Sequence, residues 1–359
     1  MNGKYKAIWL NDNGDLEVLD QRVLPHEEKT VTLTNAQESI DAIKDMTIRG
    51  AGVIGCVAAF GVYLAARECN GSFDCMKKHA FDIRESRPTA VNLMWAVDRM
   101  LDSLENSTNI IEDSKIEAIA ISDEDAMRSV KIGQYGCEII EDILKIKNKK
   151  RINILTHCNA GWLAILDEGS ALAPIYEAKK RGIDVHVYVD ETRPRNQGAN
   201  LTSWELSRGG VEHTIIADNT GGHLMQHGEV DMVITGADRV SRGGDVANKI
   251  GTYLKALAAN DNNIPFYVAL PASTFDFSIV DGVKEIEIEE RSENEVHFMR
   301  GVLENGDVTE VRITPEGSKA LNIGFDVTPN RLITGLITER GICKATQIDI
   351  EKTFSLESK

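Results

Sequence analysis

The half of the chain after Ile152 alternates short apolar segments with segments of helical character, and this alternation most constrains the fold. Four of the apolar segments end in polar clusters, which read THCNAG, DETRPRNQGA, TGADRV and LPASTFD. Strands that alternate with helices form parallel sheets with helices on both faces. We therefore predict an α/β fold with a doubly wound, Rossmann-like parallel sheet. Its strands are expected at residues 152–155, 185–189, 213–217, 232–235 and 266–270.

Asp238 follows the apolar run at residues 232–235, just beyond the expected carboxyl end of that strand. Ligands of open α/β sheets bind at this edge, because the loops there face a common crevice. An Asp before a loop is, however, more often a turn or cap residue. The glycine-rich stretch after Asp238 is expected to lead into a helix. Lys249, next to Asn248, would meet a phosphate where that helix begins.

Cys158 follows the first strand of this half and is the best candidate for a nucleophile or polarising group. Gly161 would permit a tight turn into a helix. A Cys at a helix N-terminus has a lowered pKa and acts as a thiolate, whereas a closed apolar pocket keeps the thiol neutral. The sequence leaves both open, and a free Cys is often buried and inert. The neighbouring His157 would point elsewhere and is predicted to be structural.

The loop after the second strand combines two acids, an arginine and an amide. These are Asp190, Glu191, Arg193 and Gln197, and a helix through Leu206 is expected to follow. We interpret the loop as a hydrogen-bonding platform at the same edge of the sheet.

The first half of the chain, residues 1–147, predicts a smaller α+β domain made of a β-hairpin and helices. The turn Asn11–Gly14 supplies the residues that tight hairpin turns need. The basic run at residues 148–151 marks the boundary to a second, catalytic domain, residues 148–359, and we interpret this run as solvated surface. Strands are expected at residues 6–10, 16–19 and 30–33. Helices are expected up to residue 43, with Thr34 or Asn35 as the cap, at 51–67, 73–83 and 88–104, and as one or two helices at 116–146.

Two arginines of the first domain precede predicted helices. Arg49, Gly50 and Ala51 stand at the start of an apolar helix, where backbone N–H groups and a guanidinium would point at one spot. Arg87 stands before the helix that has Pro88 in its first turn. Helix N-termini bind phosphates, and arginine pairs with phosphate oxygens. Taken alone, each position is more often an ordinary loop or surface residue, so each is a candidate for phosphate binding and no more.

Charge and cysteine usage limit the partners. The 40 Lys and Arg residues stand against 56 Asp and Glu, and the net charge of −16 argues against nonspecific binding to nucleic acid or to an anionic membrane. An anionic substrate would need a local basic pocket. The six cysteines contain no C-x-x-C pair and are unevenly spaced, so we expect neither a zinc site nor a disulfide framework. We therefore expect the protein to lie in the reducing cytoplasm.

Other classes of protein are disfavoured by missing motifs. The N-terminus lacks the basic and apolar regions of a signal peptide, and no apolar run approaches the ~20 residues needed to span a bilayer. No G-x-G-x-x-G follows the strand at residues 152–155, which disfavours a nicotinamide dehydrogenase, and the chain has no P-loop.

A series of ordered motifs runs through residues 1–345. They are LDQRVLPHE (19–27), RGA (49–51), RPTAVNL (87–93), THCNAG (156–161), DETRP with QGA (190–199), GADRV with GDVANKIGTY (236–253) and EIEIEER (285–291). In order and length they resemble the motifs of the methylthioribose-1-phosphate isomerase family. The wider superfamily includes ribose-1,5-bisphosphate isomerases and regulatory subunits of a translation initiation exchange factor, which lack the Cys and Asp pair in this setting.

The resemblance implies a function and a site. It implies conversion of the aldose S-methyl-5-thioribose 1-phosphate to the ketose S-methyl-5-thioribulose 1-phosphate, a step of methionine salvage. It also implies a small sugar phosphate as partner, no metal, no organic cofactor, and a cytoplasmic homodimer. Carried onto this sequence, the catalytic pair is Cys158 and Asp238, and the substrate is held by Arg49, Gly50, Ala51, Arg87, Gln197, Asn248 and Lys249.

The chemistry of such a substrate suggests roles for the pair. An aldose 1-phosphate cannot open to a free aldehyde, because the ester locks its anomeric carbon. We hypothesise that Asp238, kept protonated by an apolar surround, protonates the ring oxygen, and that Cys158 lies on the opposite side of C1 and C2. Cys158 would abstract the C2 proton or stabilise charge during a hydride shift, and the sequence leaves both open.

The chain departs from the family pattern near the substrate loops. The family usually reads RGAP where Gly52 follows RGA here, and it usually has Arg where Asn200 stands. Arg195 and Asn196 also make the preceding loop polar. The alternatives are therefore an isomerase of 5-deoxyribose 1-phosphate or ribose 1,5-bisphosphate, or a non-catalytic regulatory subunit that binds a sugar phosphate or nucleotide.

Overall fold

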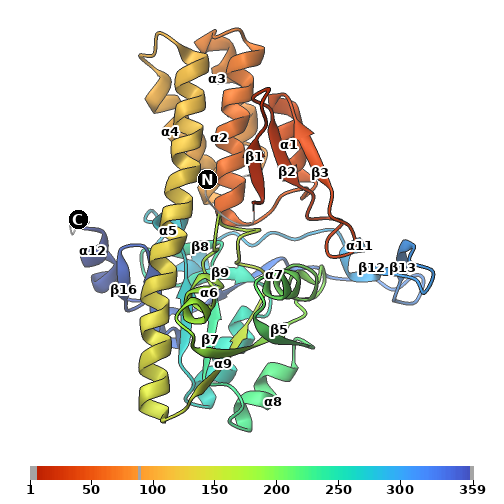
Figure 1. Ribbon diagram of the computed structural model, residues 1–359, viewed down its shortest axis with the longest axis vertical. Coiled ribbons are helices and arrows are strands. Elements are labelled where there is room, and N and C mark those ends of the chain that lie inside the picture. The colour runs from red at the N-terminus through yellow and green to blue at the C-terminus, as the bar shows by residue number, and fades with distance from the viewer. Residues whose placement is uncertain (1–5, 88–89, 356–359) are drawn as a thin grey trace.

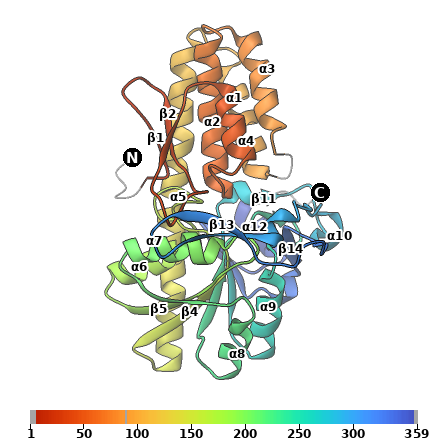
Figure 2. The same cartoon turned by 90° about the vertical axis from the view of Figure 1, so that its right-hand side faces the viewer.

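A helical body stacks on one edge of an α/β body, as Figures 1 and 2 show from two sides. The computed structural model describes residues 6–87 and 90–355. The helical body begins with an antiparallel sheet, β1 (Ile8–Leu10), β2 (Leu16–Leu19) and β3 (Thr30–Leu33), in that order. Its helices are α1 (Ala36–Lys44), α2 (Ala51–Glu68), α3 (Phe73–Arg84), α4 (Val91–Leu104) and α5 (Ile110–Lys147).

Local side-chain hydrogen bonds explain where these first elements begin. In the β1–β2 turn, the side chain of Asn11 accepts from the backbone N–H of Asp15 at 3.0 Å, which closes the predicted hairpin. Asn35 caps α1 by accepting from the N–H of Glu38 at 2.9 Å, also as predicted. The predicted start of the fourth helix is wrong, because α4 begins at Val91; residues 88 and 89 lie outside the described part.

Helix α2 is the core of the helical body. It starts after Gly50, whose φ of 91° lies in the region that favours glycine, and its residues from Gly52 to Ala66 are buried. By length and composition it is the one helix among the described residues that could cross a bilayer. Because most of it is buried inside the protein, it fits the core helix of a folded body better.

Helix α5 joins the two bodies. The sequence allowed one or two helices here, and the structure has one continuous helix of 38 residues. Its first half packs in the core of the helical body through Ala118 and Ile121, whereas its second half packs on the large sheet through Ile132 and Ile140. A domain boundary at residue 148 remains our proposal; it follows the end of α5, although α5 packs against both bodies.

The α/β body is built on a seven-stranded sheet in the order β16-β15-β10-β7-β4-β5-β6. All neighbours are parallel except the antiparallel edge strand β16. This is the doubly wound Rossmann order, so the predicted fold class is confirmed. The strands are β4 (Arg151–Thr156), β5 (Asp184–Asp190), β6 (Glu212–Ile216), β7 (Met232–Thr235), β10 (Phe266–Ala269), β15 (Gly335–Thr338) and β16 (Gly341–Cys343).

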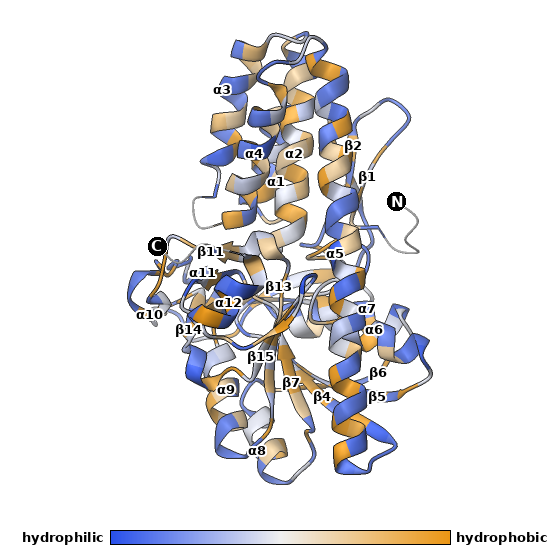
Figure 3. Cartoon of the chain, turned by 90° about the vertical axis from the view of Figure 1, so that its left-hand side faces the viewer, coloured by the Kyte–Doolittle hydropathy of each residue, from blue (hydrophilic) through white to orange (hydrophobic). Residues whose placement is uncertain are grey.

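Helices cover both faces of this sheet. One face packs on α5 with α6 (Ala173–Lys180) and α7 (Ser203–Arg208). The other packs on α8 (Thr220–Gln226), α9 (Thr252–Asp261) and α12 (Gln347–Phe354). Strands β7 and β15 are accordingly mainly hydrophobic (Figure 3). Strands that are buried on both faces read as continuous apolar runs, which is why the sequence predicted β4, β7 and β10 within one residue at each end, whereas β15 was not predicted.

The loops after two central strands differ from the prediction. No helix follows β4 directly, because residues 157–172 form turns before α6 begins at Ala173. After β7 the chain forms a hairpin, β8 (Arg239–Ser241) and β9 (Val246–Lys249), and α9 begins only at Thr252. Asn248 and Lys249 thus lie in a strand, and the predicted helix start at these residues is wrong.

The remaining elements extend the carboxyl edge of the sheet. The hairpin β8–β9 belongs to a small sheet in the order β11-β8-β9-β14, and β12 pairs with β13 in a hairpin that projects from the body (Figure 1). The strands are β11 (Phe275–Asp276), β12 (Phe298–Val302), β13 (Val308–Arg312) and β14 (Phe325–Thr328). The short helices are η1 (Gly198–Thr202), η2 (Ala272–Thr274), α10 (Gly282–Glu285), α11 (Asn294–His297) and η3 (Asn330–Leu332).

Two further expectations are corrected. Cys69 and Cys75 form a disulfide between α2 and α3, although no disulfide was expected from the cysteine spacing. The basic run at residues 148–151 is not merely solvated, because the ammonium of Lys149 lies 2.7 Å from the buried carboxylate of Asp231. Uneven spacing hid the disulfide, since a tight turn between two helices brings the two cysteines together.

Candidate active site

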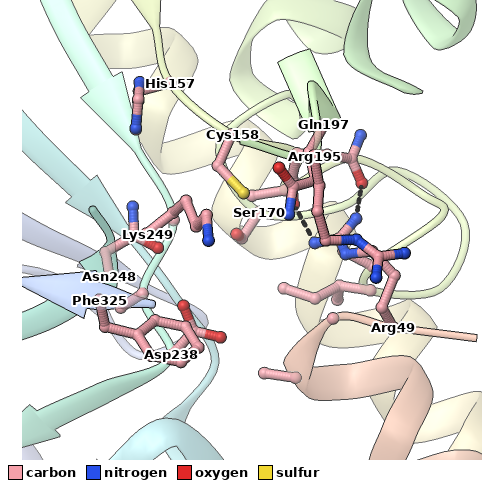
Figure 4. Close-up of a pocket in the computed structure, with 18 of the residues that line it drawn as sticks. Arg49, His157, Cys158, Ser170, Arg195, Gln197, Asp238, Asn248, Lys249 and Phe325 are labelled. Carbon is pink, nitrogen blue, oxygen red and sulfur yellow. Dashed lines mark hydrogen bonds between the residues drawn. The ribbon is translucent and has the colours of Figure 1, made fainter. Parts of the chain in front are cut away.

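A pocket with an empty volume of about 700 Å³ lies where the carboxyl edge of the large sheet meets the start of α2. The structure brings all nine predicted site residues to its wall. From the helical body come Arg49, Gly50, Ala51 and Arg87, and from the α/β body come Cys158, Gln197, Asp238, Asn248 and Lys249. Figure 4 shows the labelled side chains around the cavity.

Cys158 and Asp238 face the pocket from the two central strands of the sheet. Cys158 follows β4 and Asp238 follows β7, which are neighbours in the sheet. The strands after β4 (β5 and β6) lie on one side of this pair, and those after β7 (β10 and β15) lie on the other. This is the topological switch point, where a crevice opens outside the strand ends. In Figure 4 the two side chains lie on different sides of the cavity, with Lys249 between them.

Cys158 is held by its backbone and carries a neutral thiol. Its N–H donates to Oγ1 of Thr192 at 2.9 Å, and its carbonyl accepts from Oγ1 of Thr202 at 2.7 Å. Its φ of 64° turns the chain sharply at the strand end. Burial raises the pKa of Cys158 and the nearby Asp238 adds to this, against the positive charge of Arg49. The raised pKa favours the neutral thiol over the thiolate.

The carboxyl group of Asp238 makes no hydrogen bond to a described residue. The backbone N–H of this residue donates to the carbonyl of Ala247 at 2.9 Å, which fixes it at the base of the β8–β9 hairpin. Burial raises the pKa of its carboxyl group, while Arg87, Arg49 and Lys249 lower it. A carboxyl group with a raised pKa can serve as a proton donor.

The cations of the pocket differ in how far they are neutralised. Arg87 lies 3.7 Å from Glu289, so part of its charge is balanced. Arg49 instead donates to the side chain and carbonyl of Asn159, at 2.6 and 2.7 Å. Lys249 is buried, and its ammonium has no hydrogen bond or ion pair to any described residue; the ring of Phe325 lies 5.8 Å away. Burial lowers its pKa.

The other predicted binding residues supply polar atoms and space. The side-chain oxygen of Gln197 is buried and unpaired among the described residues. The amide nitrogen of Asn248 donates to Thr252 at 2.9 Å, which leaves its oxygen for the pocket. A Cβ at Gly50 would overlap Ala164, so this glycine permits the close approach of the two bodies.

Sequence reasoning missed several residues of the pocket wall. Arg195 and Arg291 line the pocket, and both contact Glu295, at 3.1 and 2.9 Å. Although burial opposes it, hydrogen bonds from Arg291 lower the pKa of Glu295 to about 2, so this carboxylate is charged. Arg291 ends the motif EIEIEER, and that motif was the available signal. Phe325 comes from β14, which the sequence did not predict.

His157 makes structural contacts, but the prediction that it points away from the site is wrong, because it lines the pocket. Its Nδ1 lies 2.9 Å from Oδ2 of Asp190 and its Nε2 lies 2.9 Å from the carbonyl of Ile250. His157, Asp190 and Asp218 are near enough to hold a metal ion, but the ammonium of Lys255 lies 3.0 Å from Asp190 within this cluster. A second cluster of possible metal ligands consists of Cys69, Cys75 and His79, but its two cysteines are joined in a disulfide. Neither arrangement is suited to a divalent metal as it stands.

A second, more apolar pocket adjoins the first. It has an empty volume of about 520 Å³ and shares Ala51, Arg87, Asp238 and Phe325 with the first pocket. The rest of its wall is mainly aliphatic, with Ile54, Ala90, Val91, Ala247, Ile286 and Ile288, and its polar members are Asn92, Arg239 and Glu287. Asp238 thus lies between a basic compartment and an apolar one.

Comparison with known proteins assigns the class. Residues 47–345 match the family described as the initiation factor 2 subunit family. The crystal structure of translation initiation factor eIF-2B, subunit delta, from A. fulgidus has a TM-score of 0.80 and 36% identity, over 98% of this chain and 100% of that one. The fold is that of this class.

Other relatives define the branch within the class. A methylthioribose-1-phosphate isomerase of Sulfurimonas denitrificans is 67% identical over 99% of both chains, and one of Desulfatibacillum aliphaticivorans is 53% identical over 99% and 98%. The structure of 5-methylthioribose 1-phosphate isomerase from Pyrococcus horikoshii OT3 has a TM-score of 0.85 and 36% identity, over 99% and 97% of the chains. The chain belongs to the methylthioribose-1-phosphate isomerase family, which confirms the resemblance seen in its motifs.

Proposed function

We propose that this protein is an aldose–ketose isomerase that converts S-methyl-5-thioribose 1-phosphate to S-methyl-5-thioribulose 1-phosphate in methionine salvage. The observation that carries the proposal is the pocket itself. A neutral thiol and a carboxyl group with a raised pKa face each other across a basic cavity at the switch point. Full-length similarity to methylthioribose-1-phosphate isomerases supports the same reaction.

Asp238 is the proposed acid of ring opening. Because the phosphate ester blocks spontaneous opening, the ring oxygen must receive a proton as its bond to C1 breaks. Burial raises the pKa of Asp238, which favours its protonated form, and its carboxyl group has no hydrogen bond to a described residue. After donating, its carboxylate is stabilised by the charges of Arg87, Arg49 and Lys249, and it can then accept the proton of the C2 hydroxyl.

Cys158 is the proposed partner on the other side of C1 and C2. As a neutral thiol it can stabilise charge during a hydride shift, and as a thiolate it could take the C2 proton. The raised pKa favours the neutral form and therefore hydride transfer. Arg49 lies close enough to lower this pKa, so a bound phosphate that neutralises Arg49 would favour the neutral thiol further.

Arg49, Arg87 and Lys249 are the proposed phosphate-binding residues. Asp238 is the one carboxylate among the described residues of the pocket wall, so the wall has an excess of positive charge. Gly50 and Ala51 place the start of α2 at the cavity, although the N–H of Val53 is already bonded to Ala164. Gln197 and Asn248 offer oxygens to the sugar hydroxyl groups.

The apolar compartment bears on the 5-substituent. A methylthio group is apolar and suits a wall of aliphatic side chains such as Ile54, Ile286 and Ile288. A second phosphate there would meet Arg87 and Arg239, but Arg87 lies 3.7 Å from Glu289 and Arg239 lies 3.6 Å from Asp276, so both cations are already partly neutralised. The methylthio sugar is therefore favoured over ribose 1,5-bisphosphate, and 5-deoxyribose 1-phosphate is the nearer alternative.

Proton NMR in deuterated water tests the proposal. The purified protein is incubated separately with methylthioribose 1-phosphate, 5-deoxyribose 1-phosphate and ribose 1,5-bisphosphate, and kcat/KM is compared. We expect the methylthio sugar to react best, with no deuterium at C1 of the ketose if hydride transfer operates. Failure of all three sugars to react would favour the regulatory-subunit alternative, for which the similarity to eIF-2B subunit delta is the supporting observation.

We further propose that the protein is a cytoplasmic homodimer that binds neither nucleic acid nor membrane. The charge of −16 supports the lack of nucleic-acid and membrane partners. Val302 and Val311, which are 48% and 47% exposed on the projecting β12–β13 hairpin, support a contact with a second copy. Light scattering after size-exclusion chromatography gives the mass in solution, and a monomer would contradict the dimer.

A further inference from the structure

Glu205 is a buried carboxylate beside the site that the proposed reaction leaves without a role. It lies in α7 with no exposed surface. Its Oε1 accepts from Nδ2 of Asn159 at 2.8 Å and from the N–H of Leu163 at 3.1 Å. Its Oε2 accepts from the N–H of Trp162 at 2.9 Å and from the hydroxyl of Tyr176 at 3.4 Å. All four partners donate, so an ionised carboxylate, which only accepts, satisfies every one.

Asn159 connects this carboxylate to a cation of the pocket. Its side-chain nitrogen donates to Glu205, while its side-chain oxygen accepts from Nη1 of Arg49 at 2.6 Å. Its carbonyl accepts from Nη2 of Arg49 at 2.7 Å. Because Glu205 and Oγ1 of Thr202 accept from the amide nitrogen, at 2.8 and 3.2 Å, the amide oxygen must face Arg49. The chain from carboxylate to amide to guanidinium therefore fixes the direction in which Arg49 points.

The same carboxylate holds the loop that follows Cys158. Replacing a hydrogen of Gly161 by a Cβ would overlap Oε2 of Glu205, so the loop passes as close to the carboxylate as a backbone can. On its other side, the carbonyl of Ala164 accepts from the N–H of Val53 at 2.9 Å. Residues 158–164 are thus clamped between α7 and the start of α2.

We propose that Glu205 is a positioning residue, which holds the loop of Cys158 and aims Arg49 at the phosphate of the substrate. This inference rests on the proposed isomerase function. Burial raises the pKa of Glu205 to about 7, against hydrogen bonds from Asn159, Leu163 and Trp162. The groups that face it are Tyr176 on α6 and, across Asn159, Arg49. The clamp is therefore fully formed above neutral pH and loosens as pH falls through about 7.

Glu205→Gln tests the proposal with little change of shape. The amide would present its own hydrogens to two of the four donors, so the loop and Arg49 would shift. We expect kcat/KM for methylthioribose 1-phosphate to fall about 10- to 100-fold at pH 8, mainly through KM. The ratio of the KM values of variant and wild type should approach one at about pH 6, where Glu205 of the wild type is itself protonated.

A second readout does not need turnover. Arg49 lowers the pKa of Cys158, so its release should move the pH midpoint of Cys158 alkylation by iodoacetamide upward. Asp231→Asn is the matched control, because Asp231 is also buried and also accepts several hydrogen bonds, but at the opposite end of β7. The control should lose stability and keep the wild-type KM and alkylation midpoint.

The outcomes separate the two proposals. Wild-type KM, kcat and alkylation midpoint in Glu205→Gln would overturn the positioning role. If that variant does not fold, Asn159→Ala cuts the link to Arg49 and leaves Glu205 bonded to the loop amides; an unchanged KM there would overturn the role, and a raised KM would support it. If the wild type converts none of the three sugars, the proposed function fails, and the alkylation midpoint still decides the role of Glu205.

Discussion

Replacing Lys249 by methionine should weaken substrate binding and stabilise the folded protein at the same time. Lys249 is 4% exposed, and its ammonium has no hydrogen bond or ion pair to a described residue, although the ring of Phe325 lies 5.8 Å away. An unpaired buried charge lowers the free energy of unfolding. A protein retains such a charge where a ligand supplies the partner. Lys249→Met keeps the apolar stem and removes the charge, so it separates the two effects.

The expected size of each effect follows from the surroundings of Lys249. A hydrogen bond to a charged group is worth about 1.5–3 kcal/mol, so kcat/KM for the sugar phosphate should fall about 10- to 150-fold. Removing an unsatisfied buried group should return about 1–3 kcal/mol of stability. For an α/β body of this size that raises Tm by about 2–4 °C for each kcal/mol.

The gain in stability should depend on pH. Burial lowers the pKa of Lys249 below its ordinary 10.5, although Cys158, Glu295 and Asp238 oppose the change. The charge therefore destabilises the folded state fully at pH values below the lowered pKa. This cost shrinks as pH rises through that pKa and disappears above 10.5, where both states are neutral. The Tm difference between variant and wild type should decrease accordingly.

Calorimetry with steady-state kinetics measures both quantities. Lys255→Met is the control, because Lys255 is equally buried but lies 3.0 Å from Asp190 and also donates to the carbonyl of Asp218. The control should lower Tm, since it leaves Asp190 without its cation. An unchanged KM in Lys249→Met would refute the phosphate role, and a lowered Tm would refute the unpaired charge.

Further changes give distinct results. Asp238→Asn should lower kcat by about 10²–10⁴ with little change in KM, and it should remove the decline in wild-type kcat as pH rises through the raised pKa of Asp238; wild-type turnover would exclude the acid role. Cys158→Ser should also lower kcat, and full activity would make the thiol a bystander. Ile286→Lys should lower kcat/KM for the methylthio sugar about 10- to 100-fold more than for ribose 1,5-bisphosphate, because the new ammonium is a poor neighbour for a methylthio group and a partner for a second phosphate, as parallel assays would show. Reducing the Cys69–Cys75 disulfide should lower Tm without changing kcat/KM, because it lies at the far end of α2, about 27 Å from the pocket; altered kinetics would contradict this.

Much of the site could be predicted because it depends on strand ends. The apolar strands β4 and β7 are continuous in the sequence, so the residues that follow them, Cys158 and Asp238, could be placed at one edge of a sheet. Arg49 could be placed because the apolar run of α2 shows where that helix begins. In each case a short-range pattern determined where the side chain lies.

The remaining features depend on contacts between distant segments. Lys249 was expected at a helix start, but residues 246–249 pair with β14, about 75 residues later, and so form a strand. Arg291 and Phe325 reach the pocket from segments without a strong periodic pattern. Glu205 was read only as part of a helix, since three of its partners, Asn159, Trp162 and Leu163, lie more than 40 positions earlier in the chain. The intrinsic helix or strand preference of a residue does not predict which distant segment it pairs with.

Substrate exchange is constrained by the continuity of α5. A helix of 38 residues, about 57 Å long, packs in the hydrophobic cores of both bodies and crosses their junction without a break. A hinge between the bodies would have to bend this helix or strip one half from its core. We therefore expect the sugar to enter and leave through side-chain and loop motions on nanosecond to microsecond times, not through slower opening of the whole protein. Association should then be set by diffusion and by the positive charge of the pocket, and it should slow as salt is added.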